Sequence, residues 1–275
     1  MKRVAGSNCE IMGASWNLWK KHLKKMIFLV VACACVILSA CQTDQNEEPV
    51  QEESEPAPIV VGFSQLGAES DWRNMHTQSM KTVFTEKNGY KLIFEDGQQK
   101  QSNQIKAIRR FIQQEVDYIV LAPVQENGWD TVLEEAKEAG IPVILVDRAV
   151  AVSDESLFSC WVGSDFVLEG RKVCGWLEQY LRMEEIPAEE VRIVNLQGTI
   201  GASAQIGRTK ALREAARKNG WQLLAEADGD FTQMKAKESM KKLLREYEDI
   251  NIVYCENDNE AFGAIEALEE AGKKV

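Results

Sequence analysis

Asp147 and Arg148 stand side by side directly after residues 141–146, an uninterrupted apolar run rich in β-branched side chains. Such a run is typical of a strand buried on both faces of a parallel sheet. In open α/β sheets, ligands bind beyond the carboxyl ends of the strands, so these two side chains are candidates for ligand contact. The carboxylate offers paired acceptors and the guanidinium a fork of donors, which suits a ligand made of hydroxyl groups. The alternative interpretation is a structural ion pair at a strand end.

Polar and aromatic side chains also follow the other predicted strands. The further candidates are Glu69, Ser70, Asp71, Trp72, Arg73, Arg208, Phe231 and Asn257. Aromatic faces that alternate with carboxylate, amide and guanidinium groups suit a sugar, because its C–H face packs on rings while its hydroxyls donate and accept. For Phe231, ordinary packing is the alternative interpretation. The set predicts a carbohydrate site.

The sequence carries no pattern that predicts catalysis, a metal or a cofactor. It lacks G-x-S-x-G, G-x-x-x-x-G-K-[ST], G-x-G-x-x-G and H-E-x-x-H. It contains two histidines and no CxxC pair, which argues against a zinc site or a histidine-activated nucleophile. Glu69 and Asp71 are two carboxylates on one predicted loop, but carboxylates at this spacing rarely straddle a glycosidic bond as a glycosidase pair must. We therefore expect a binding protein without enzymatic activity.

Strands and helices are predicted to alternate from residue 59 to residue 271. The predicted strands span residues 59–64, 90–95, 116–122, 141–147, 156–162, 191–196, 221–226 and 251–254. The predicted helices span residues 72–88, 99–115, 129–139, 166–183, 203–218, 232–247 and 257–271. A long series of this kind indicates an α/β fold with parallel sheets and helices on both faces. Its length favours two similar lobes.

The first 58 residues differ from this pattern. Residues 20–25 are basic and are followed by about fifteen mostly apolar residues, the arrangement of a signal peptide. Residues 42–58 contain six acids, three prolines and no base, which predicts a disordered linker. The net charge of −11 argues against nucleic acid as a partner.

Several segments in order resemble a known family, the type I periplasmic sugar-binding proteins of ABC transporters. The similarity is to the ribose-binding-like branch and, within it, to the galactofuranose-binding group. The segments are residues 61–73, 95–112, 121–129, 141–148, 196–208, 229–240 and 256–273. Residues 38–41 (LSAC) likewise resemble a bacterial lipobox, which implies lipidation of Cys41 after removal of residues 1–40. An uncleaved amino-terminal membrane anchor is the alternative.

The resemblance implies two Rossmann-like lobes, residues 59–163 and 164–275, that close on one sugar. Trp72 would then stack on the sugar, Asp147 and Arg148 would hold adjacent hydroxyls, and Arg208 and Asn257 would close from the second lobe. Relatives often have glycine in place of Asp71, and this carboxylate is expected to alter the preferred sugar. Relatives also continue beyond the position of Val275, so we expect an incomplete second lobe and hinge, low stability and weak sugar binding.

The resemblance further implies a lipid-anchored, extracytoplasmic receptor that delivers a monosaccharide, galactofuranose-like or another pentose or hexose, to an ABC permease and its ATPase. We expect a monomer that needs no cofactor. A sensory module that presents its ligand to a membrane histidine kinase is the alternative. A cytoplasmic repressor is disfavoured by the export signal and by the lack of a basic helix-turn-helix before residue 59.

Overall fold

The computed structural model describes residues 56–274. The predicted signal peptide, Cys41 and most of the acidic linker lie outside these residues. The strands are β1 (Ile59–Gln65), β2 (Tyr90–Asp96), β3 (Tyr118–Leu121), β4 (Val143–Asp147), β5 (Cys160–Gly163), β6 (Arg192–Gln197), β7 (Gln222–Asp228) and β8 (Ile252–Cys255). The α-helices are α2 (Asp71–Val83), α3 (Gln101–Gln113), α4 (Asp130–Glu138), α5 (Phe166–Met183), α6 (Ser203–Asn219), α7 (Gln233–Glu246) and α8 (Asp258–Glu270).

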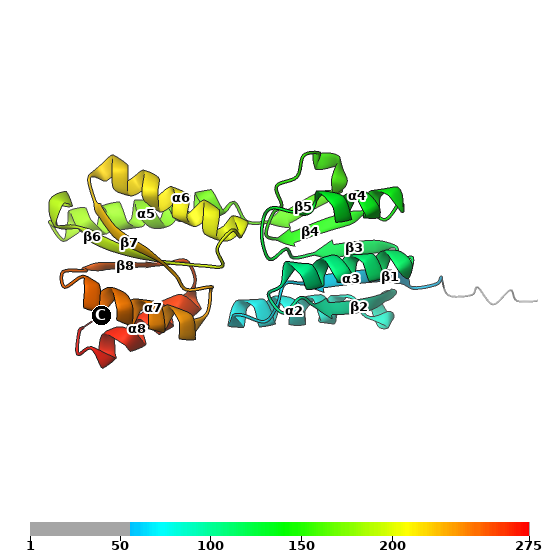
Figure 1. Ribbon diagram of the computed structural model, residues 1–275, viewed down its shortest axis with the longest axis horizontal. Helices are drawn as coiled ribbons and strands as arrows, with labels where there is room; N and C mark the ends of the chain where they lie inside the picture. The colour runs from blue at the N-terminus through cyan, green and yellow to red at the C-terminus, as the bar shows by residue number, and fades with distance from the viewer. Residues whose placement is uncertain (1–55, 275) are drawn as a thin grey trace, which may run out of the picture. The chain divides into compact units, whose positions relative to one another are not determined.

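The first sheet has the strand order β2-β1-β3-β4-β5, and every pair in it is parallel. Helices α3 and α4 pack on one face through apolar side chains such as Phe111 and Leu133. Helix α2 packs on the other face through Met80, next to Phe63 and Val120 of the strands. The apolar runs of the sequence therefore form strands that are covered from both sides, as Figure 1 shows.

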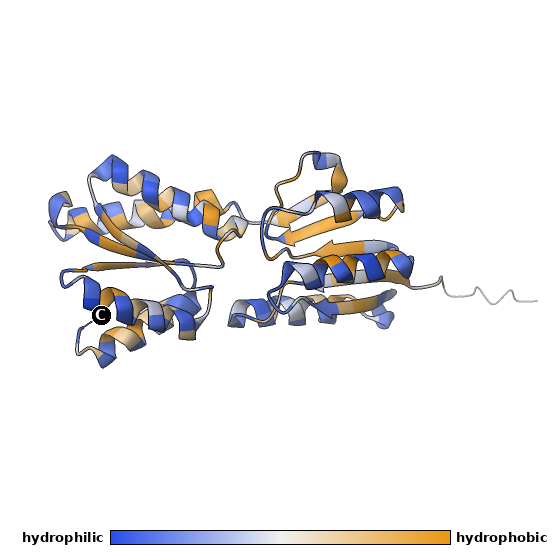
Figure 2. Cartoon of the chain, in the orientation of Figure 1, coloured by the Kyte–Doolittle hydropathy of each residue, from blue (hydrophilic) through white to orange (hydrophobic). Residues whose placement is uncertain are grey.

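The second sheet has the order β7-β6-β8 and is also parallel. Helices α5 and α6 cover one face with Leu177 and Leu212, whereas α7 and α8 cover the other with Met240 and Ala267. Hydrophobic residues lie mainly on the strands and on the helix faces turned toward them (Figure 2). These two sheets confirm the predicted α/β fold with parallel sheets. We call residues 59–163 the first half and residues 164–274 the second half; the lobe boundary at 163/164 stays a prediction.

Two predicted elements differ clearly from the structure, whereas the others differ by at most two residues at either end. The helix predicted at 72–88 ends at Val83, and a short 3-10 turn, Glu86–Asn88, precedes β2. Phe84, the residue after the helix, packs edge-on against Tyr90 of that strand, with ring centroids 5.1 Å apart. The strand predicted at 156–162 begins only at Cys160, because the Asp154 side chain accepts the Ser156 N–H and fixes a 3-10 turn there.

Two features are absent from residues 56–274. No helix there has the length and apolar composition needed to cross a bilayer. No group of three or more His, Cys, Asp or Glu side chains in this range is arranged to hold a metal ion.

Candidate ligand-binding site

A cavity of about 500 Å³ lies where the polar strand ends of both halves meet, and we call it the cleft. All ten predicted site residues line it: Glu69, Ser70, Asp71, Trp72, Arg73, Asp147, Arg148, Arg208, Phe231 and Asn257. The residues chosen from the strand ends with the help of the family resemblance therefore line one cavity, although they come from segments up to 188 positions apart. Their role in ligand binding stays a prediction.

Contacts between the halves border the cleft. The Glu126 N–H donates to the carbonyl of Gly201 over 2.8 Å. Nearby, the Ala149 N–H donates to Ser203 Oγ over 2.9 Å. These bonds connect loops of the first half to the start of α6.

The first-half wall is built around Arg73 at the start of α2. Ser70 caps this helix by accepting the Arg73 N–H over 3.1 Å, which places the first helical turn. The Arg73 guanidinium then donates to Glu69 Oε1 over 3.1 Å and to Asp147 Oδ2 over 2.5 Å. Arg73 is only 2% exposed, so two carboxylates neutralise an almost completely buried cation. Asp147 therefore makes its short ion pair with Arg73 and not with Arg148, its neighbour in the sequence.

Arg148 is the second buried cation of this wall. Asp147 has a left-handed backbone with φ of 63°, where the chain turns at the end of β4. Arg148 donates to the carbonyl of Val124 over 2.9 Å and lies 3.6 Å from Glu69 and 3.9 Å from Asp147. Burial lowers the pKa of Arg148 to about 10, and the Arg73 cation acts in the same direction. Arg148 is therefore still cationic near pH 7.

The second-half wall centres on Arg208 of α6. Its guanidinium donates to Glu169 Oε2 over 2.8 Å and to the carbonyl of Glu256 over 2.8 Å. The same group lies 5.1 Å from the ring of Phe166 and 5.9 Å from that of Phe231. Arg208 thus combines a charged partner with aromatic neighbours.

Phe231 connects the two walls. Its ring is 4% exposed and lies 5.1 Å from the Arg148 guanidinium of the first half. Asp230 and Phe231 both have left-handed backbones, with φ of 54° and 58°, and this turn directs the ring inward. The Phe231 N–H donates to Glu260 Oε1, and its carbonyl accepts from Asn257 Nδ2. Phe231 is therefore both a packed residue and a cation–π partner.

Asn257 has a structural role that the sequence analysis did not predict. Its Oδ1 accepts the Glu260 N–H over 2.8 Å, and the Glu260 carboxylate accepts the Asn257 N–H, which forms a capping box at the start of α8. Because its Nδ2 donates to Phe231, both ends of the amide are already bonded. A ligand would have to share these atoms.

The rim of the cleft is more exposed than its floor. Trp72 is 57% exposed and lies next to Asp71, which contacts Asn259 of the second half. The Asp71 N–H lies 3.4 Å from Asn259 Oδ1, and Asn259 Nδ2 lies 3.4 Å from Asp71 Oδ2. Asn259 thus gives Asp71 a contact across the cleft.

We expect Asp71→Ala to weaken ligand binding about threefold, since one exposed hydrogen-bonded pair contributes roughly 0.5–1.5 kcal/mol. Asn259→Ala should have the same effect, and the double variant should lose no more than either single one. A double-mutant cycle by titration calorimetry measures this coupling. Strictly additive losses would show that the two side chains do not act together.

Sequence reasoning missed the buried pair Glu256 and Glu260. Glu256 directly follows β8, so the strand-end rule could have included it. Its carboxylate accepts from Thr209 Oγ1 over 2.5 Å and from the Gly198 N–H over 3.0 Å. Glu260 accepts three backbone N–H groups, those of Phe231, Glu256 and Asn257. The pair thus connects the strand ends of the second half.

Burial raises the pKa of both carboxyl groups of this pair. The pKa of Glu256 rises to about 7, and that of Glu260 to about 8 because the Glu256 charge adds to the effect of burial. A carboxyl group whose folded pKa is raised favours folding while it is protonated. Its contribution is complete below pH 4.5 and is lost as the pH rises through 7 and 8.

We therefore expect the free energy of unfolding to fall by several kcal/mol between pH 5 and pH 8.5. Glu256→Gln removes one titrating group, so the stability of this variant should depend less on pH over this range than that of the wild type. Urea unfolding at several pH values measures both curves. Parallel curves for the two proteins would show that Glu256 does not titrate in this window.

Comparison with known proteins places the chain among binding proteins. Residues 61–275 match the family described as "Periplasmic binding protein domain". The galactofuranose-binding protein YtfQ of Escherichia coli (strain K12) is 44% identical over 222 residues, which cover 79% of this chain and 68% of the relative. The crystal structure of a galactofuranose binding protein superposes with a TM-score of 0.75 at 43% identity, covering 79% of this chain and 73% of the other.

A third similar protein is the periplasmic binding component of the arabinose ABC transporter from Shewanella sp. ANA-3, bound to α- and β-L-arabinofuranose. It has a TM-score of 0.72 and 43% identity, and the match covers 78% of this chain and 70% of the other.

Proposed function

The chain belongs to the periplasmic binding protein family, and on this basis we propose that it binds a neutral monosaccharide in the cleft, with furanose forms of pentoses and hexoses as the preferred class. The observation that carries the proposal is the position of Arg148. This fully buried cation lies between Glu69 and Asp147 and faces Phe231 across the cleft. Donors, acceptors and an aromatic face thus meet in one cavity, which is the combination a sugar ring needs.

One carboxylate oxygen in this wall lacks a hydrogen-bond donor. Glu69 Oε1 contacts Arg73 and Arg148, but its Oε2 is buried and has no hydrogen-bond partner among residues 56–274. A buried acceptor without a donor costs roughly 1–3 kcal/mol or more when charged. A ligand that donates a hydroxyl proton there would remove this penalty, so we expect the sugar to bind next to Glu69.

The charges of the cleft favour a neutral ligand. Arg73 is paired with Glu69 and Asp147, and Arg208 is paired with Glu169. Arg148 shares the first two carboxylates. No arginine of this set lacks a carboxylate neighbour, so a sugar phosphate or uronic acid would compete with existing ion pairs. We therefore infer selection against anionic sugars.

We further propose that the protein is a monomeric, extracytoplasmic receptor, lipid-anchored at Cys41, that delivers its sugar to an ABC permease without chemical change. Family membership and the similarity to the binding component of an arabinose ABC transporter support the transport role. The basic and apolar segments before residues 38–41 support the anchor. The two halves are the proposed lobes, and sugar contacts from both would favour the closed arrangement.

A thermal-shift screen tests the binding function. The purified protein is heated with L-arabinose, D-galactose, D-ribose and D-fructose, and with galactose 6-phosphate and galacturonate as charged comparisons. At a ligand concentration about 1,000 times the dissociation constant, binding stabilises a protein by about 4 kcal/mol, which raises its Tm clearly. We expect a shift with at least one neutral sugar and none with the anions. A shift only with the anionic sugars would contradict the proposal.

A further inference from the structure

His76 lies behind the first-half wall, one helical turn after Trp72 on α2. Its ring stacks on the Trp72 indole, with centroids 5.2 Å apart and planes 23° apart. Phe63 of β1 contacts the imidazole edge-on, with centroids 5.9 Å apart and planes at 86°. The imidazole therefore lies between the core of the first sheet and the most exposed aromatic side chain of the cleft wall.

A hydrogen bond from the backbone to Gln65 determines which nitrogen of His76 carries the proton. Gln65 is fully buried, and its Oε1 accepts the Leu66 N–H over 3.1 Å. The Nε2 of the same amide must then face the other side, where it lies 2.9 Å from Thr77 Oγ1 and 3.1 Å from His76 Nδ1. Since this amide nitrogen can only donate, Nδ1 of His76 must be an acceptor. The neutral ring therefore carries its proton on Nε2.

Arg73 also requires Nδ1 of His76 to be a hydrogen-bond acceptor. Its Nη1 lies 3.4 Å from Nδ1, so a second donor, and a charged one, points at this nitrogen. The same guanidinium lies 4.9 Å from the Trp72 ring and is bonded to Asp147. A proton on Nδ1 would face two donors and would push the Arg73 cation away from its place in the wall. His76 is thus in contact with both residues that it can position, Trp72 and Arg73.

We propose that neutral His76 is a positioning residue that holds Trp72 and Arg73 in the sugar-binding arrangement, and that protonation of its ring releases them and weakens sugar binding in acid. This inference rests on the proposed sugar-binding function. It assigns no direct ligand contact to His76, which does not line the cleft.

The charged groups around His76 come from three segments. Arg73 on α2 opposes protonation, whereas Glu69 on the preceding loop and Asp147 at the end of β4 favour it. Burial is the largest effect, and together with Arg73 it lowers the pKa of His76 below the usual 6.5. A base whose folded pKa is lowered is neutral in the native protein and is protonated only as the pH falls below that range. The expected loss of affinity therefore lies below pH 6.5.

Sugar affinity is measured by titration calorimetry from pH 7.5 to pH 5.0 for the wild type, His76→Asn and His76→Phe. Asparagine can place an amide oxygen near the position of Nδ1 and does not titrate, whereas phenylalanine keeps a ring below Trp72 but offers no acceptor. We expect the wild-type affinity to fall about tenfold or more over this range. His76→Asn should change less than threefold, and His76→Phe should bind weakly at every pH. An equal pH dependence in the wild type and His76→Asn would overturn the proposal, provided that circular dichroism shows both proteins folded.

A second measurement needs no sugar. The Cε1–H signals of the two histidines are followed by NMR against pH, and the His76 signal is assigned by its absence in His76→Asn. We expect a titration midpoint below 6.5 that moves upward in Arg73→Gln, because the opposing cation is gone. A midpoint at or above 6.5 that does not move in Arg73→Gln would refute the coupling even in a protein that binds sugar. If His76 titrates as expected but the protein binds no sugar at any pH, the proposed function is wrong instead.

Discussion

Replacement of Arg148 by alanine should reduce sugar affinity by a factor of about 30 to several thousand, the equivalent of roughly 2–5 kcal/mol. The guanidinium is 2% exposed and neutralises the carboxylates of Glu69 and Asp147 from within the cleft wall. Its removal takes away hydrogen-bond donors for the ligand. It also leaves the carboxylates of Glu69 and Asp147 without one of their two cationic neighbours. Titration calorimetry with a sugar found in the thermal-shift screen gives the dissociation constants.

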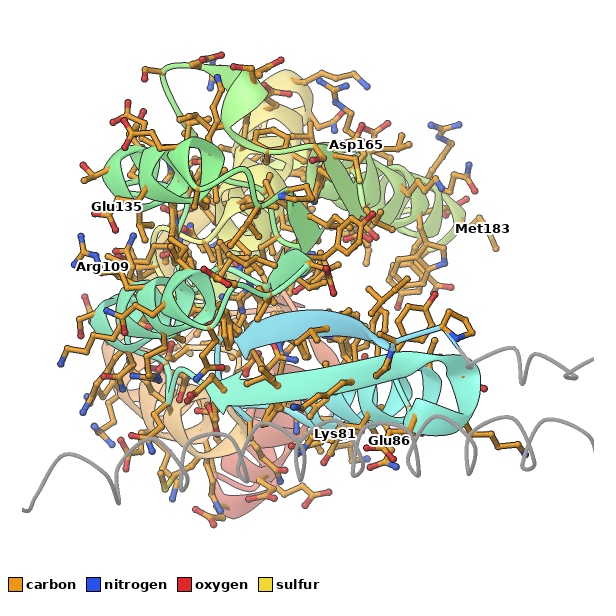
Figure 3. The ribbon with its side chains drawn as sticks, turned by 90° about the vertical axis from the view of Figure 1, so that its right-hand side faces the viewer. Lys81, Glu86, Arg109, Glu135, Asp165 and Met183 are labelled. Carbon is orange, nitrogen blue, oxygen red and sulfur yellow. The ribbon has the colours of Figure 1, made fainter. Side chains whose placement is uncertain are left out.

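Arg109→Ala is the matched control. Arg109 on α3 makes a two-bond ion pair with Glu135 on α4, and its side chain is 50% exposed at the surface (Figure 3). Neither residue lines the cleft. Exposed pairs contribute about 0–1 kcal/mol, so this variant should keep its sugar affinity and nearly all its stability. If Arg148→Ala binds within twofold of the wild type, the cleft is not the sugar site.

The second large effect is expected for Gly198→Ala. Gly198 follows β6, and a Cβ added there would lie 1.9 Å from the Phe231 ring. Phe166 and Ala204 pack around this ring, and Glu260 holds its backbone, so the ring has little room to move except into the cleft. We expect a loss of stability of about 1–3 kcal/mol from overpacking. The displaced ring would also leave its position next to Arg148, so we expect about a tenfold loss of sugar affinity.

Gly175→Ala in the middle of α5 separates this steric effect from the general effect of adding a methyl group. A Cβ at Gly175 meets no atom within 4 Å. Alanine in place of a helical glycine stabilises by roughly 0.5–1 kcal/mol, so this variant should melt slightly higher than the wild type and bind normally. A Gly198→Ala protein with wild-type Tm and affinity would mean that Phe231 does not occupy the position described above.

Much of the fold could be predicted because each strand is a short apolar run and most helices begin or end at a recognisable residue. The helix at Phe166–Met183, for example, has the limits expected from its spacing. The wrong limits of α2 and β5 depend on contacts that spacing does not encode. The end of α2 at Val83 depends on the packing of Phe84 against Tyr90. The late start of β5 depends on a side-chain bond from Asp154 to the backbone.

The individual residues of the candidate site could be predicted from the sequence, but the ion pairs between them could not. The strand-end rule selects Asp147 and Arg73 separately, and nothing in the sequence indicates that they bond to each other across 74 positions. The role of His76 could not be predicted either, because its tautomer depends on how Gln65 is oriented by the Leu66 backbone. Side-chain orientation of this kind follows from the packed structure and not from residue type or spacing.

A crystal structure of the protein grown with saturating L-arabinose or D-galactose, whichever gives the larger thermal shift, tests the central claim most directly. We expect one sugar ring in the cleft, with hydroxyl groups bonded to Glu69 and Arg148 of the first half and to Arg208 of the second. A sugar that contacts only one half, or that binds outside the cleft, would contradict the account.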